Sequence, residues 1–148
     1  MASQHVRVES TTTADPATVY ALLRDGSGWP EFTPLGSYEL VSAGTGEPTE
    51  LGEIRIFHTG RFHAREQIVE MIENRRLSYV LLAGMPLRGY RADVDLEPTD
   101  SGTLIRWHST FDPKTFGTGW LYRTQLQGFI QKTADGLAAR ATEVARDR

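Results

Sequence analysis

The chain has 148 residues, 24% charged residues and a net charge of −3, a composition typical of a soluble globular protein. Basic residues are interspersed with acidic ones, so the sequence offers no clustered basic face for nucleic acid. The chain has no cysteine, which excludes disulfides and cysteine-ligated zinc. It has no apolar run near the ~20 residues of a membrane span and no signal-peptide pattern, so we expect a cytoplasmic protein.

The N-terminal part predicts one strand followed by two short helices. Residues 5–11 alternate in polarity and indicate a half-buried strand. Asp15 and Pro16 suit the first turn of a helix, and Gly26 suits a left-handed exit from it. The segment WPEF at 29–32 then begins a second, very short helix.

The middle of the chain predicts strands separated by turn residues, and the end predicts one long helix. The strands are expected at 37–43, 53–58, 61–71, 77–83, 90–97 and 103–111. From Trp120 to about Val144 apolar residues recur at helical spacing, which indicates an amphipathic helix about 37 Å long. Together these elements predict a curved antiparallel sheet beside one terminal helix, in a single domain over 1–148 with its core at about 5–145.

Several segments in this order match those of a known superfamily. They are DPATVYALLRDGSGWPEFTP, LGEIRIF, REQIVEMIENRRLSY, GTLIRWHSTFDP and the closing helix. The chain resembles the START/Bet v 1-like (SRPBCC) superfamily, and within it the bacterial polyketide cyclase/dehydrase-type proteins. The resemblance implies an α+β helix-grip fold, in which a seven-stranded antiparallel sheet curves around the C-terminal helix, two short helices follow the first strand, and a cavity lies between sheet and helix.

The hairpin of strands 90–97 and 104–111 has one charged face and one apolar face. We expect the charged faces to share the outside, because a slip of one residue would move them into the core. The inner pairs are then Leu96 with Ile105, Val94 with Trp107, Ala92 with Ser109 and Tyr90 with Phe111. The outer pairs are Asp95 with Arg106 and Asp93 with His108.

Strand 61–71 determines the polar part of the cavity. If Ile54 and Ile56 form the inner face of the preceding strand, a two-residue loop at 59–60 turns alternate residues of strand 61–71 inward. These are His63, Arg65, Gln67, Val69 and Met71. The opposite arrangement, with Glu66 and Glu70 facing the cavity, stays open because a β-bulge would reverse the alternation.

The predicted site therefore has a polar end and an apolar end. Candidate catalytic residues are Arg65, His63, Tyr79 and Tyr90. Candidate ligand-binding residues are Gln67, Leu81, Trp107, Ser109, Phe111, Leu126, Phe129, Ile130 and Trp29. His58 and His63 lack a third ligand at a metal-site spacing, so no metal and no organic cofactor are expected.

The first functional hypothesis is that the protein binds a hydrophobic small molecule of the polyketide, lipid, steroid or quinone class. An alternative, implied by the resemblance, is a polyketide cyclase/dehydratase that promotes aldol closure. Arg65 would then stabilise the enolate, and His63, Tyr79 or Tyr90 would transfer the proton. A third possibility is a protein-interaction module of the co-chaperone type. A monomer or homodimer is expected in each case.

Overall fold

The computed structural model describes residues 3–44 and 50–148, so part of the predicted 44–52 loop lies outside the described residues. The elements in chain order are β1 (Gln4–Thr12), α1 (Pro16–Arg24), η1 (Gly26–Gly28), α2 (Trp29–Phe32), β2 (Ser37–Ser42), β3 (Ile54–Thr59), β4 (Phe62–Ile72), β5 (Arg76–Ala83), β6 (Leu87–Thr99), β7 (Gly102–Pro113) and α3 (Gly119–Arg146).

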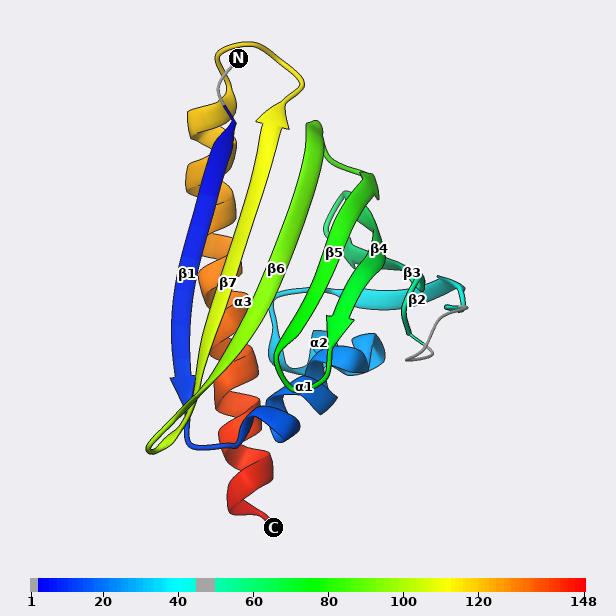
Figure 1. Cartoon of the computed structure of the whole chain (residues 1–148). Helices are drawn as coiled ribbons and strands as arrows, with labels where there is room; N and C mark the ends of the chain where they lie inside the picture. Colours follow the sequence, from blue (N-terminus) through cyan, green and yellow to red (C-terminus); the bar gives the residue numbers. More distant parts are fainter. Residues whose placement is uncertain (1–2, 45–49) are drawn as a thin grey trace.

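The seven strands form one antiparallel sheet in the order β1-β7-β6-β5-β4-β3-β2. The helix α3, whose 28 residues span about 42 Å, packs along the sheet mainly against β1 and β7. In Figure 1, α1 and α2 lie at the opposite end of the sheet from the β7–α3 connection, and both also contact α3. The predicted helix-grip fold is confirmed.

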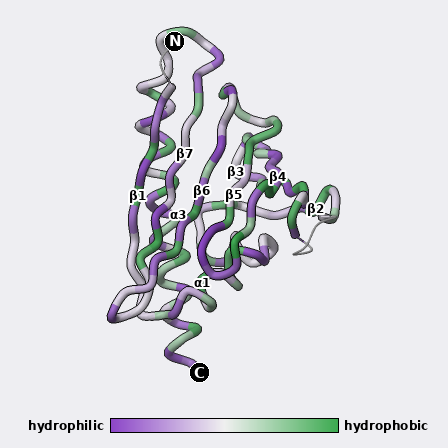
Figure 2. Tube along the Cα trace, in the orientation of Figure 1, coloured by the Kyte–Doolittle hydropathy of each residue, from purple (hydrophilic) through white to green (hydrophobic). Residues whose placement is uncertain are grey.

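Helix α3 buries one stripe of its surface against the sheet. Its fully buried positions recur every three to four residues, and hydrophobic and hydrophilic stretches alternate along it in Figure 2. These positions are Leu126, Ile130, Thr133, Ala134, Leu137, Ala138 and Ala141. The prediction of an amphipathic terminal helix is therefore correct.

The short helix α1 begins as predicted, but Gly26 beyond its end has a different role from the one expected. The Asp15 carboxylate accepts a hydrogen bond from the Thr18 N–H at 2.9 Å, and Pro16 occupies the first turn. Gly26 does not adopt a left-handed conformation, which corrects the expectation. A Cβ atom at Gly26 would lie 2.7 Å from the Arg55 guanidinium and 2.9 Å from the Tyr38 ring, so glycine is needed for packing.

The predicted register of β6 and β7 is confirmed where the strands are regular. Leu96 lies opposite Ile105, Val94 opposite Trp107, Ala92 opposite Ser109, Asp95 opposite Arg106 and Asp93 opposite His108. The register shifts between Arg88 and Arg91, so Tyr90 and Phe111 are not a regular pair, although their rings lie 6.2 Å apart. Strict alternation with charge on one face was sufficient to specify this hairpin.

The predicted inner faces of β3 and β4 are wrong. The last pair before the turn is Thr59 with Phe62, and Gly60 occupies the first turn position with a φ of +60°. Phe57, which is 1% exposed, faces the interior, whereas Ile54 and Ile56 are only half-buried. Because the two strands alternate together, the inner residues of β4 are Phe62, Ala64, Glu66 and Ile68.

A β-bulge explains why the prediction failed on β4. Met71 lies opposite Leu77, as expected. The register then shifts between Ile68 and Glu70, so Ile68 rather than Val69 lies opposite Tyr79. The extra residue reverses the alternation along the rest of β4 toward the hairpin.

The contact between α2 and α3 leaves no room for a side chain at Gly136. A Cβ atom there would lie 1.8 Å from the Phe32 carbonyl oxygen. The Gly136→Ala variant should therefore lose about 2 kcal/mol or more of unfolding free energy, because α2 must move. Urea denaturation measures this loss.

Gly128 on the same helix is the matched control. A Cβ atom at Gly128 meets nothing within 4 Å. Gly128→Ala should be neutral or stabilising by up to about 1 kcal/mol, through helix propensity alone. Equal stability of the two variants would contradict the proposed packing constraint.

Candidate functional site

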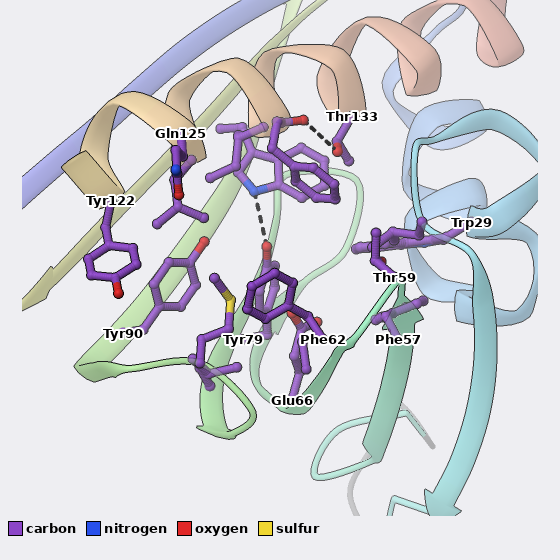
Figure 3. Close-up of a pocket in the computed structure, with 18 residues that line it drawn as sticks. Trp29, Phe57, Thr59, Phe62, Glu66, Tyr79, Tyr90, Tyr122, Gln125 and Thr133 are labelled. Atoms are coloured by element: carbon purple, nitrogen blue, oxygen red, sulfur yellow. Dashed lines mark hydrogen bonds between the residues drawn. The ribbon is translucent and has the colours of Figure 1, made fainter. Parts of the chain in front are cut away.

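A cavity of about 350 Å³ lies between the inner face of the sheet and α3 (Figure 3). Its volume is within the range of about 300–1,000 Å³ typical of small-molecule sites. The lining residues are Trp29, Leu35, Phe57, Thr59, Phe62, Ala64, Glu66, Tyr79, Leu81, Met85, Tyr90, Trp107, Tyr122, Gln125, Leu126, Phe129, Ile130 and Thr133. Most of them are apolar or aromatic, so the cavity suits a ligand with a large apolar surface.

Trp29 closes one end of the cavity through contacts with three strands. Its ring stacks on Phe57 with centroids 5.1 Å apart and meets Trp107 edge-on at 5.7 Å. The ring of Tyr79 lies 6.4 Å away, also edge-on. The Trp29 indole N–H donates to the Leu23 carbonyl oxygen at 3.2 Å, which ties the ring to the end of α1. The cluster fixes this wall with aromatic contacts and one hydrogen bond.

A buried arginine packs against the Trp29 ring and is not among the residues that line the cavity. Arg55 is 2% exposed, and its guanidinium carbon is 5.7 Å from the Trp29 ring centroid. The Arg55 Nε donates to Glu53 at 2.8 Å, and its Nη2 donates to the Arg24 carbonyl oxygen at 2.8 Å. These partners compensate for the burial of the charge.

Glu66 is the acidic residue that lines the cavity. It lies directly opposite Arg55 on the neighbouring strand, but the Arg55 guanidinium is directed toward Glu53 and Arg24 instead. Among residues 3–44 and 50–148, no group forms a hydrogen bond or ion pair with the Glu66 carboxyl. Burial raises the pKa of Glu66 to about 8, although the nearby positive charge of Arg55 acts in the opposite direction.

Two tyrosine hydroxyls lie on the same inner surface. The Trp107 indole N–H donates to the Tyr79 hydroxyl at 3.3 Å, and the rings of Tyr79 and Tyr90 are 6.3 Å apart. Burial raises the pKa of Tyr90 to about 12 and the pKa of Tyr79 well above its ordinary value. Both hydroxyls therefore stay protonated at physiological pH and are able to donate hydrogen bonds.

The structure brings many of the predicted residues into the cavity wall. Those that line it are Trp29, Tyr79, Leu81, Tyr90, Trp107, Leu126, Phe129 and Ile130. Ser109 and Phe111 are each 2% exposed, and both lie within the core, outside this lining. Gln67 donates its side-chain amide to the Gly52 carbonyl oxygen at 3.2 Å, away from the cavity.

His63 and Arg65 lie on the outer face of β4, which corrects the predicted orientation. Both are exposed. His63 Nδ1 lies 2.6 Å from His58 Nδ1, and His58 Nε2 lies 3.2 Å from Glu39. Within the part of the chain that the structure describes, no group of three or more His, Cys, Asp or Glu residues has the geometry of a metal site.

The sequence-based interpretation missed the wall contributed by β3 and β4. Its main residues are Phe57, Phe62, Ala64 and Glu66. Phe57, Phe62 and Ile68 would have indicated the correct face if the bulge had been recognised. Without it, the isoleucines of β3 offered an equally apolar alternative.

Comparison with known proteins agrees with this architecture. The family model described as polyketide cyclase / dehydrase and lipid transport matches residues 3–142. No curated protein sequence matches the chain significantly.

No helix of the described residues is long and apolar enough to cross a membrane.

Several solved structures share the fold at low sequence identity. StfQ, a di-domain ARO/CYC from the steffimycin biosynthetic pathway, has a TM-score of 0.80 and 16% identity over 97% of this chain, which spans about half (52%) of StfQ. A START superfamily protein from Mycobacterium smegmatis has a TM-score of 0.78 and 13% identity, covering 96% of this chain and 98% of its own. Major latex-like protein 151 from Panax ginseng has a TM-score of 0.73 and 15% identity, covering 94% and 97%.

The role of Trp29 in closing the cavity predicts a large effect of its removal. Trp29 is 3% exposed, so Trp29→Ala should cost about 3–5 kcal/mol of unfolding free energy. Trp120 is 63% exposed, and Trp120→Ala should change stability by less than about 0.5 kcal/mol. Chemical denaturation of both variants measures the difference, and similar values would contradict the assigned role.

The raised pKa of Glu66 predicts a pH-dependent contribution to stability. Between about pH 4.5 and 8 this carboxyl is protonated in the folded state and ionised in the unfolded state, so its contribution declines as the pH rises. Glu66→Gln removes this term, so its stability relative to the wild type should rise by up to about 4 kcal/mol between pH 5 and pH 9. Denaturation profiles across this range measure it, and parallel profiles would contradict the assignment.

Proposed function

Because the chain belongs to the polyketide cyclase / dehydrase and lipid transport family, we propose that it binds a hydrophobic small molecule between the sheet and α3. The observation that supports this proposal is the 350 Å³ cavity with mostly apolar and aromatic walls. Such walls stabilise a ligand by removing its apolar surface from water.

The shape of the lining favours a flat ring system. The rings of Trp29, Phe57 and Tyr79 line the cavity (Figure 3), as do those of Trp107 and Phe129. Aromatic rings pack favourably against other rings in stacked and edge-on arrangements. We therefore favour an aromatic ligand, of the polyketide or quinone type, over a flexible lipid chain.

A second candidate is a cyclase or dehydratase that acts on a ketone in the same cavity. The Tyr79 and Tyr90 hydroxyls support it, and the chain shares its fold with StfQ. Among the described residues, however, the lining includes no lysine or arginine to stabilise an enolate. We therefore place binding first.

Filling the cavity should abolish binding. Ala64 lines the cavity, so Ala64→Phe should weaken the binding of a neutral aromatic dye at least tenfold by occupying its space. N-phenyl-1-naphthylamine is suitable, because its fluorescence increases in apolar surroundings. A titration of the dye into each variant measures the affinity.

The neighbouring residue provides a matched control. His63 lies on the outer face, so His63→Phe adds the same ring without entering the cavity. This variant and Arg65→Ala should bind the dye as the wild type does. If Ala64→Phe also retained full affinity, the dye would be bound elsewhere and the proposal would fail.

A further inference from the structure

We propose that the Glu66 carboxyl group is the polar anchor of the cavity and donates a hydrogen bond to a carbonyl oxygen of an uncharged aromatic ligand. This inference rests on the proposed function and names the ligand chemistry that the cavity selects. It is carried by the position of Glu66, by the engagement of its nearest cation elsewhere, and by the polar groups that share the wall.

The position of Glu66 makes it available to a ligand. It is half-buried on the inner face of β4, and its side chain points into the cavity beside Phe62 and Tyr79 (Figure 3). The cross-strand Arg55 is held by Glu53 and by the Arg24 carbonyl, so it is not directed at Glu66. A polar group in an apolar cavity without a partner is costly, and a ligand supplies that partner.

The two tyrosine hydroxyls on this wall are able to donate hydrogen bonds. The Tyr79 hydroxyl accepts from Trp107 and keeps its own hydrogen, and the Tyr90 hydroxyl stays protonated. A carbonyl oxygen of the ligand, which only accepts, complements this surface.

The charge of the lining opposes anionic ligands. No lysine or arginine is among the described residues that line the cavity, so a carboxylate would lose its hydration without gaining a cation. Since the pKa of Glu66 is raised to about 8, its carboxyl is mostly protonated at neutral pH and is able to donate. Ionisation above that pH removes the donated hydrogen bond.

Four ligands that share one ring system but differ in their polar group test whether the cavity prefers a carbonyl group, a cation or an anion. They are fluorene, 9-fluorenone, 9-aminofluorene and fluorene-9-carboxylate, and their affinities are measured by calorimetry or by displacement of the bound dye. We expect wild type at pH 6.5 to bind fluorenone about tenfold more tightly than fluorene, and the carboxylate more weakly than either. The preference for fluorenone should shrink as the pH rises from 7 to 9.

Two variants assign the preference to Glu66. Glu66→Gln keeps an N–H donor that does not titrate, so it should retain the fluorenone preference at both pH 6.5 and pH 9. Glu66→Leu has no donor, so it should bind fluorene and fluorenone equally. Unchanged fluorene affinity shows that each variant has kept its cavity.

The outcomes separate this inference from the proposed function. A fluorenone preference that persists in Glu66→Leu, or tightest binding of wild type to 9-aminofluorene, would overturn the inference. Fluorene binding would in either case preserve the proposed function. Failure of wild type to bind any of the four ligands would overturn both.

Discussion

The packing of Trp29 is the contact on which the cavity depends. This residue connects the short helices to three strands, because it stacks on Phe57, meets Trp107 and Tyr79 edge-on, and bonds to the end of α1. Its indole occupies one end of the space between sheet and helix. At this end the remaining volume is therefore bounded by aromatic rings.

The distribution of charge follows from the same arrangement. Arg55 is buried behind Trp29 with its own partners, and the outer face of the sheet carries ion pairs such as Arg76 with Asp95 at 2.6 Å. Glu66 is the acidic residue among the described lining residues, and none of residues 3–44 and 50–148 forms a hydrogen bond or ion pair with its carboxyl. The chemistry of the interior thus rests on one carboxyl and a few hydroxyls, which makes the site selective through very few atoms.

The extent to which the sequence predicts the structure differs from one hairpin to the next. The order of elements, the terminal helix and the pairing of β6 with β7 were predictable, because each has one apolar and one charged face. The faces of β3 and β4 were not, because Ile56 and Phe57 made both faces of β3 apolar and the bulge at Val69 has no strong sequence pattern. The aromatic residues of α2, β5, β6, β7 and α3 were therefore found, whereas those of β3 and β4 were missed and Glu66 was left as an alternative to His63 and Arg65.

The bulge at Val69 also has a consequence for how such proteins diversify. If Val69 were instead paired regularly within the strand, the alternation of β4 would reverse toward the hairpin, and His63 and Arg65 would face inward in place of Ala64 and Glu66. The mostly apolar cavity with one carboxyl group would then contain basic side chains, while the order of the strands stayed the same. In this architecture, the presence or absence of one bulge decides which residues of a strand line the cavity, a change that separate point mutations would reach only one position at a time.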